Sequence, residues 1–250
     1  MIALPAGYAL IDLESVDSTN DEAKRRAAGG AVDGTVIVAR RQVSGRGRRG
    51  RLWDSPRGNL YCSLLLRPEQ PLETVMQLGF VAALALYDSL SARAPSGVSI
   101  ACKWPNDVLV SGRKCAGILM ETAGGSSALP PDWLVLGFGV NVAQGPSQSE
   151  FPATSLMESG FGVVPVQTLL ADVLGHFERW RRLWQKRGFA AVRTAWLAAA
   201  YGQGEAIVVR LHEETLYGTF ADLDGDGALL VDVAAGRRRV TAGDVFFAGS

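Results

Sequence analysis

The spacing of apolar residues over most of the chain predicts alternating buried strands and amphipathic helices. Residues 35–40, 60–66 and 133–142 form largely apolar runs, which are typical of strands buried on both faces. Apolar side chains recur every three or four positions across residues 75–90 and 166–184, which predicts helices with one face in the core. This alternation favours an α+β domain.

The pattern changes after the Tyr-Gly-Gln-Gly break at residues 201–204. Short apolar runs separated by polar turns then predict strands at residues 206–211, 216–221, 228–233 and 245–247. The Asp-Gly-Asp-Gly segment at 224–227 predicts a hairpin turn, because the other ligands of a calcium loop are missing. We expect a small β-barrel of about 45 residues, with His212 and the arginine run 237–239 on its surface. The predicted domains are residues 1–203 and 204–250.

Composition indicates an ordinary soluble globular protein. Hydrophobic residues make up 48% of the 250 and charged residues 20%, and 25 basic residues balance 25 acidic ones. This balance disfavours general nucleic-acid binding, which needs a basic face across the domain. Cys62, Cys102 and Cys115 form no Cys-x-x-Cys pair, so neither a zinc site nor a disulfide framework is expected.

The sequence predicts a cytoplasmic location without membrane contact. The N-terminus has no cationic segment before an apolar core, so a signal peptide is not expected. The longest apolar run, residues 78–87, is shorter than the roughly 20 residues that a membrane-spanning helix needs. The three unpaired cysteines suit a reducing compartment.

The run Gly-Arg-Gly-Arg-Arg-Gly-Arg at residues 45–51 is the strongest chemical signal in the chain. Glycine lets the backbone approach a ligand closely, and arginine presents a planar fork of donors to carboxylate and phosphate. Two other interpretations remain open for the run alone: a solvated basic patch or a nucleic-acid arm. Its Gly-x-Gly-x-x-Gly spacing also matches a dinucleotide fingerprint, but the turn residues that follow do not open a helix. The run therefore favours an anion-binding loop.

A helix of about ten residues is predicted to begin at Ser18-Thr19-Asn20. Thr19 and Glu22 have the spacing of a capping box, so one interpretation is a simple helix cap. A functional interpretation is that this helix start and its small polar side chains bind a polar ligand.

The segment Lys-Trp-Pro-Asn-Asp at residues 103–107 precedes two apolar runs that flank a Ser-Gly turn. This pattern predicts a hairpin in which Asp107 and Lys114 share one face. The alternative is an ordinary turn with a surface lysine. Two glycines in the strand at 133–142 favour a ligand that passes close to its backbone, and Asn141 needs a polar partner if it is buried.

With these motifs in this order, the chain resembles the biotin protein ligases from about Asp12 to Phe247. The resemblance implies a mixed sheet with helices on one side, as in class II synthetases and biotin ligases, followed by a small C-terminal SH3-like β-barrel. It also implies that biotin and ATP, with Mg²⁺, form biotinyl-5'-AMP, and that biotin then passes to one lysine of a biotin carboxyl carrier protein.

The resemblance also assigns roles to residues of this chain. Those expected to bind biotin are Ser18, Thr19, Asn20, Gln42, Gly45, Arg46, Gly47, Arg48, Lys114 and Gly117. Those expected to bind ATP are Arg48, Arg51, Trp53, Lys114 and Asn141. Arg48, Lys114 and Asp107 are the expected catalytic residues, and no metal site made by protein ligands alone is expected.

Some relatives carry an N-terminal helix-turn-helix of roughly 60 residues, which does not fit the short lead of this chain. We therefore expect a ligase that does not bind DNA, with a homodimer as an open possibility. The alternative enzyme is a lipoate-protein ligase or octanoyl transferase of the same fold, which the intact Gly-Arg run disfavours. A sensing module without catalysis is a further alternative, which Lys114 and Arg48 disfavour.

Overall fold

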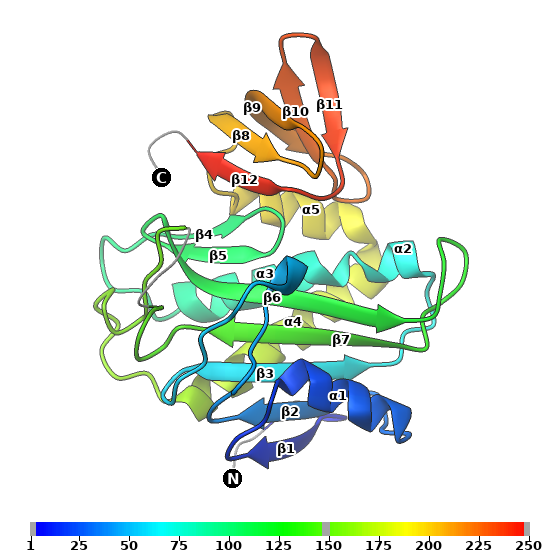
Figure 1. Cartoon of the computed structure of the whole chain (residues 1–250), viewed down its shortest axis with the longest axis vertical. Coiled ribbons are helices and arrows are strands. Elements are labelled where there is room, and N and C mark those ends of the chain that lie inside the picture. Colours follow the sequence, from blue (N-terminus) through cyan, green and yellow to red (C-terminus); the bar gives the residue numbers. More distant parts are fainter. Residues whose placement is uncertain (1–3, 147–150, 248–250) are drawn as a thin grey trace.

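A seven-stranded mixed sheet forms the larger part of the protein (Figure 1). The computed structural model describes residues 4–146 and 151–247. The strands are β1 (Ala9–Leu13), β2 (Thr35–Ala39), β3 (Leu60–Leu66), β4 (Ile100–Lys103), β5 (Asp107–Val110), β6 (Arg113–Ala123) and β7 (Trp133–Val140), in the order β1-β2-β3-β7-β6-β5-β4. Only β1 and β2 are parallel among these neighbours, so the predicted mixed sheet is confirmed.

Most helices cover one face of this sheet. They are α2 (Leu72–Val75), α3 (Leu78–Ser91), α4 (Val166–Arg187) and α5 (Phe189–Ala198). Figure 1 shows α3 and α4 behind the sheet, where they enclose the main hydrophobic core. α4 is amphipathic, as predicted, and ends at Gly188, whose φ of 71° lies in the left-handed region.

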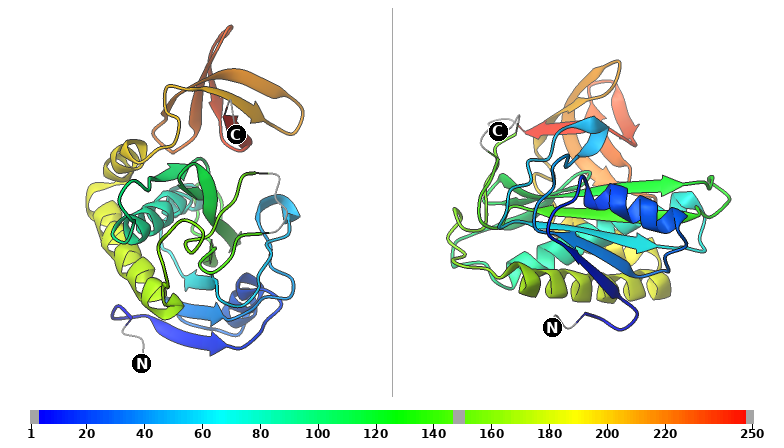
Figure 2. Two further views of the ribbon diagram at one scale, coloured as in Figure 1. Left: turned by 90° about the vertical axis from the view of Figure 1, so that its left-hand side faces the viewer. Right: turned by 60° about the horizontal axis from the view of Figure 1, so that its bottom comes forward.

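The prediction that the helices lie on one side is incomplete, because α1 (Thr19–Ala28) packs on the opposite face (Figure 2). Ala23 and Ala27 of α1 form a second, small cluster with Ile37, Leu65 and Val135. Their neighbours along the same strands point into the main core. Strands β2, β3 and β7 are thus buried on both faces, which explains their continuous apolar runs.

One helical stretch, Leu72–Ser91, is long and apolar enough to cross a membrane by length and composition alone. Of its most apolar window, 56% is buried inside the protein. Core helices pass the same test, so this stretch is weak evidence for a membrane span.

The C-terminal part is a five-stranded antiparallel sheet, ordered β11-β10-β9-β8-β12. Its strands are β8 (Ala206–Arg210), β9 (Thr215–Leu223), β10 (Leu229–Val233), β11 (Gly236–Val240) and β12 (Asp244–Phe247). Strand β11 was not predicted, because its arginines resemble a surface run. The predicted turn at 224–227 joins β9 to β10, and Asp224 and Asp226 both bind Arg239 there. This sheet is compatible with the predicted SH3-like barrel.

The turn between β9 and β10 also joins the two sheets. The indole nitrogen of Trp104 donates to the carbonyl of Gly227 over 3.1 Å. A Cβ on Gly227 would lie 2.5 Å from the ring of Phe80, so only glycine fits this close approach. The second sheet is therefore held beside the end of β4 and β5, which brings β12 close to the pocket described next.

Candidate functional site

A pocket of about 300 Å³ opens where the two sheets meet. Its walls come from the start of α1, the segment 46–54, the β4–β5 turn, the facing strands β6 and β7, and the start of β12. Among the predicted site residues, those that line it are Ser18, Thr19, Asn20, Gln42, Arg46, Gly47, Arg48, Arg51, Trp53, Asp107, Lys114, Gly117 and Asn141. Gly45 lies behind the wall, where a Cβ would be 2.5 Å from the Trp53 carbonyl. The structure thus brings the predicted motifs together.

One side of the pocket carries buried, uncharged polar groups. Thr19 donates to the side-chain carbonyl of Gln42 from its backbone nitrogen over 2.8 Å and from its hydroxyl over 3.1 Å. Ser63, fully buried on β3, lies 2.6 Å from Asn20 Oδ1 and 2.8 Å from Thr19 Oγ1. Ser63 was not predicted, because a serine inside an apolar strand gives no functional signal.

The predicted capping box is wrong. Ser18 is the N-cap residue, and its side chain makes no capping hydrogen bond. The Thr19 hydroxyl binds Gln42, and Glu22 pairs with Arg25 and Arg26. The polar groups at this helix start therefore serve the pocket wall rather than the helix cap.

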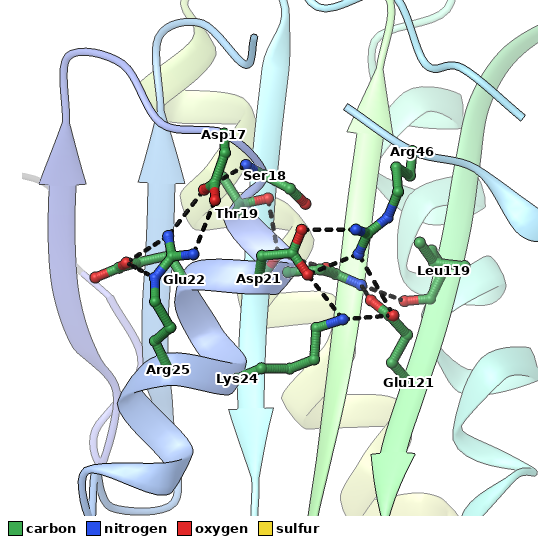
Figure 3. A network of polar contacts seen from close by, with 12 residues as sticks. Asp17, Ser18, Thr19, Asp21, Glu22, Lys24, Arg25, Arg46, Leu119 and Glu121 are labelled. Carbon is green, nitrogen blue, oxygen red and sulfur yellow. Dashed lines mark hydrogen bonds and ion pairs between the residues drawn. The ribbon is translucent and has the colours of Figure 1, made fainter. Parts of the chain in front are cut away.

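The glycine–arginine loop, residues 45–51, is anchored to α1 at its first arginine. Arg46 binds both carboxylate oxygens of Asp21 over 2.7 Å and lies 3.5 Å from Glu121 (Figure 3). Lys24 joins the same cluster, 2.8 Å from Asp21 and 2.7 Å from Glu121. Burial opposes ionisation of Asp21, but the hydrogen bonds from Arg46 and Lys24 lower its pKa below the usual range. The Arg46 guanidinium is thus engaged in anchoring the loop.

The other end of the loop is anchored to the C-terminal sheet. Arg51 binds Asp244 over 2.5 Å and Arg49 binds it over 3.1 Å. Asp244 is 8% exposed; burial opposes its ionisation, but the hydrogen bond and charge of Arg51 lower its pKa. Asp244 was not predicted, because this contact joins residues far apart in the sequence. Arg49 adopts a φ of 56°, so the turn itself is left-handed at that residue.

Arg48 points inward between these two anchors. Its guanidinium donates to Asn106 Oδ1 over 3.3 Å and to the Gly243 carbonyl over 3.4 Å. Burial lowers the pKa of Arg48, because a low-dielectric environment disfavours its charge. Asn106 also donates to the Ile118 carbonyl over 2.7 Å, so it links Arg48 to β6.

Lys114 and Asp107, which also line the pocket, meet there as predicted. The Lys114 ammonium lies 2.7 Å from Asp107 Oδ1. A register shift between Val108 and Leu109 places Lys114 opposite Leu109 in the β5–β6 hairpin. The ammonium also lies 5.3 Å from the ring of Trp53. Lys103, a further cation in the wall that was not predicted, lies 4.4 Å from the ring of Phe151 and is 7% exposed.

Two paired glycines form a flat floor between the polar side and the charged side. Gly117 on β6 faces Gly139 on β7, and a Cβ on Gly139 would lie 2.7 Å from the Trp53 indole. A Cβ on Gly137 would lie 2.3 Å from Asn20 Oδ1. The close approach to this strand is thus made by side chains of the protein itself, Trp53 and Asn20, and a ligand beside it stays a prediction.

Asn141 and the three cysteines are buried in the protein. Asn141 is buried, and its side-chain nitrogen donates to the Thr154 carbonyl over 3.0 Å, which supplies the expected polar partner. Cys62, Cys102 and Cys115 are free and buried. Within residues 4–146 and 151–247, no group of three or more His, Cys, Asp or Glu side chains could hold a metal ion.

The pocket beside the mixed sheet combines neutral hydrogen-bonding groups with a cluster of arginines and a lysine. This combination defines a ligase-type site for a small acid and an anionic co-substrate. The chain belongs to the biotin/lipoate A/B protein ligase family, whose model matches residues 4–198. A second model, the biotin protein ligase C terminal domain, matches residues 203–248.

Individual relatives agree with this assignment. The biotin--[acetyl-CoA-carboxylase] ligase of Paracoccus denitrificans is 41% identical, over 95% of this chain and 100% of the relative. The bifunctional ligase/repressor BirA of Bacillus subtilis is 32% identical, over 96% of this chain and 74% of the relative. The biotin protein ligase from Aquifex aeolicus in complex with biotin and ATP has a TM-score of 0.81 at 29% identity, covering 96% of this chain and 99% of that one.

Proposed function

We propose that this chain is an ATP-dependent biotin protein ligase. It joins biotin to ATP as biotinyl-5'-AMP, releases pyrophosphate, and transfers biotin to one lysine of a biotin carboxyl carrier protein. The observation that supports this proposal most directly is the composition of the pocket. Arg48, Lys114 and Asp107 line it together with the uncharged polar groups at the start of α1. A small acid with a neutral polar head matches this arrangement.

The first step needs two anions to react. A biotin carboxylate oxygen attacks the α-phosphorus of ATP, a new P–O bond forms, and the bond to the departing pyrophosphate breaks. Arg48 and Lys114, which line the same pocket, neutralise the carboxylate and the α-phosphate and hold them in line. Asp107 and Asp244 are already paired with Lys114 and with Arg51, so Mg²⁺ would bind mainly through ATP phosphates. When bound, Mg²⁺ would supply further charge neutralisation there.

The family resemblance and the lining of the pocket support the remaining roles. We assign Ser18, Thr19, Asn20 and Gln42 to the ureido ring, and the backbone at Arg46, Gly47 and Gly117, which also line the pocket, to the aliphatic arm and carboxylate. Because the Arg46 guanidinium is bound to Asp21, its contact with ligand falls to its backbone. Arg51, Trp53 and Asn141, which line the same pocket, are assigned to the nucleotide.

In the second step, the amine of the carrier lysine attacks the biotinyl carbonyl, the C–N bond forms, and AMP departs. The attacking amine must lose a proton, and we assign Asp107, which lies 2.7 Å from the Lys114 ammonium, to orient the amine or accept that proton. We also propose that the protein acts in the cytoplasm and does not bind duplex DNA, since its 25 basic residues are balanced by 25 acidic ones.

A mass-spectrometric assay tests the proposal. The protein is mixed with biotin, ATP and Mg²⁺, and then with a biotin carboxyl carrier domain. We expect biotinyl-5'-AMP and pyrophosphate first, and then a carrier heavier by one biotinyl group. A parallel reaction with lipoate tests the alternative enzyme. Modification of the carrier with lipoate but not with biotin would overturn the proposal.

A further inference from the structure

A chain of hydrogen bonds crosses the polar side of the pocket, and its direction is fixed at both ends. One end is Glu121 on β6, within the charged cluster of Figure 3. The Asn20 side-chain nitrogen lies 2.8 Å from Glu121 Oε2 and 3.4 Å from the Leu119 carbonyl. A carboxylate and a carbonyl can only accept hydrogen bonds, so the NH₂ group of Asn20 must face them. Its oxygen therefore faces the other way.

The second end is the backbone carbonyl of Trp53. Ser55 donates its hydroxyl to that carbonyl over 2.8 Å and accepts from the Gln42 side-chain nitrogen over 2.9 Å. The Gln42 amide is thereby oriented with its oxygen toward Thr19, which donates to it twice. The side-chain amides of Asn20 and Gln42 form this wall, the polar side of the pocket, and both are thus oriented by groups that lie behind it.

The middle of the chain completes the pattern. Ser63 is within hydrogen-bonding distance of both Asn20 Oδ1 and Thr19 Oγ1, so its single proton is used inside the wall. Both N–H groups of Asn20, one N–H group of Gln42 and the hydroxyl of Thr19 are likewise used inside the wall. The oxygens of Asn20 and Thr19 therefore keep lone pairs that can accept, so this part of the wall favours a neutral ligand that carries N–H groups.

We propose that Glu121 is a specificity-determining positioning residue, which orients the Asn20 amide so that this wall selects a ligand with N–H donors. Lys24 and Arg46, at 2.7 Å and 3.5 Å, offset the charge of Glu121 without being able to replace it as an acceptor. The inference rests on the proposed placement of the ureido ring, whose two N–H groups are the donors that such a wall would recognise.

The test uses Glu121→Gln, which keeps the shape but allows either end of the new amide to face Asn20. We expect the KM for biotin to rise roughly tenfold, with the KM for ATP nearly unchanged, because Lys24 would hold the single new amide oxygen and Asn20 would lose its charged acceptor. Preference for biotin over an analogue with one ureido N–H replaced by oxygen should fall. An unchanged biotin KM and unchanged preference would overturn the inference.

Rescue separates orientation from general structural damage. Asn20→Asp alone sets two carboxylates against each other and should raise the biotin KM further. Combined with Glu121→Gln, it restores a donor facing an acceptor, in the reverse direction, and still leaves an oxygen toward the pocket. The double variant should therefore bind biotin better than Asn20→Asp alone, and the absence of this rescue would contradict the proposal.

Lys24→Met is the matched control, because it removes a charge from the same cluster but leaves the carboxylate in place. We expect its biotin KM to stay close to that of the unmodified protein. A rise in its biotin KM equal to that of Glu121→Gln would show that charge balance, not the orientation of Asn20, sets the biotin KM. This result would overturn the inference. Failure of the unmodified protein to form biotinyl-5'-AMP would instead count against the proposed function.

Discussion

The ammonium of Lys114 lies 2.7 Å from the carboxylate of Asp107, on neighbouring strands of one hairpin. Their side chains are 23% and 13% exposed, so the pair is largely shielded from water. In this position a lysine can neutralise an anionic substrate and a carboxylate can act on an incoming amine. Replacing Lys114 and replacing Asp107 should therefore slow different steps of the reaction.

Lys114→Met should slow formation of biotinyl-5'-AMP by a factor of about 10² to 10³, because preorganised charge at the reacting groups is lost. Pyrophosphate release in a single turnover measures this step. Lys186→Met, at an exposed position near the end of α4, is the control and should react at the unmodified rate. A full rate in Lys114→Met would exclude the proposed role.

Asp107→Asn should affect mainly the transfer of biotin to the carrier. Loss of a positioned acid or base typically costs a factor of about 10² to 10⁴. Adenylate formation should change much less, because Lys114 and Arg48 remain. The measurement supplies preformed biotinyl-5'-AMP and follows biotinylation of the carrier. Equal loss in both steps would show that Asp107 serves only to hold Lys114.

Asp244→Asn should raise the KM for ATP by removing the anchor of Arg49 and Arg51. Asp244 is buried, so its replacement leaves two arginines without their shared carboxylate. A biotin KM that stays nearly constant would locate the effect at the nucleotide. Asp232→Asn removes an exposed ion pair with Arg237 on the same sheet and should leave both constants unchanged. An unchanged ATP KM in Asp244→Asn would show that the anchor is dispensable.

Local patterns predicted the parts of the site that depend on neighbouring residues. The loop at 45–51 and the hairpin that pairs Asp107 with Lys114 could be identified because glycine, turn residues and alternation act over short stretches. Contacts across the fold could not be identified in this way. Asp244 lies in a strand of the second sheet, and nothing in its own sequence context indicates that it binds the loop.

The same reasoning explains two differences in the fold. Helix α1 buries only Ala23, Ala27 and its first polar residues, so its sequence gives little sign of the sheet face that it covers. Strand β11 carries three arginines that pair with Asp232, Glu214, Asp224 and Asp226, and these acidic partners lie on other segments. An isolated arginine run does not reveal that its charges are offset.

Gly139→Ala should disturb the floor of the pocket. A Cβ there would lie 2.7 Å from the Trp53 indole, so the ring must shift. We expect weaker biotin binding and a change in tryptophan fluorescence. Gly175→Ala in α4 is the control, because nothing lies within 4 Å of its Cβ, and it should stabilise the protein by about 0.5–1 kcal/mol. Unchanged biotin affinity in Gly139→Ala would show that the floor tolerates a methyl group.

The three cysteines should be unreactive in the folded protein. Burial raises the pKa of Cys62 to about 12, and burial together with Glu158 raises the pKa of Cys115 to about 12. Burial also raises the pKa of Cys102. Since the thiolate is the reactive form, a thiol reagent at about pH 8 should label none of them until the protein is unfolded.

The raised thiol pKa values also predict how stability depends on alkaline pH. Because the folded state favours the protonated thiol, this contribution is complete below the ordinary thiol pKa of 9.0 and is lost as the pH rises toward 12. Urea unfolding at about pH 8 and about pH 10 should show a lower free energy of unfolding at the higher pH. Replacing Cys62 and Cys115 by alanine should reduce this difference, although each replacement also leaves a cavity that lowers stability at both pH values. A pH dependence identical in the double variant and in the unmodified protein would assign the alkaline loss to other groups.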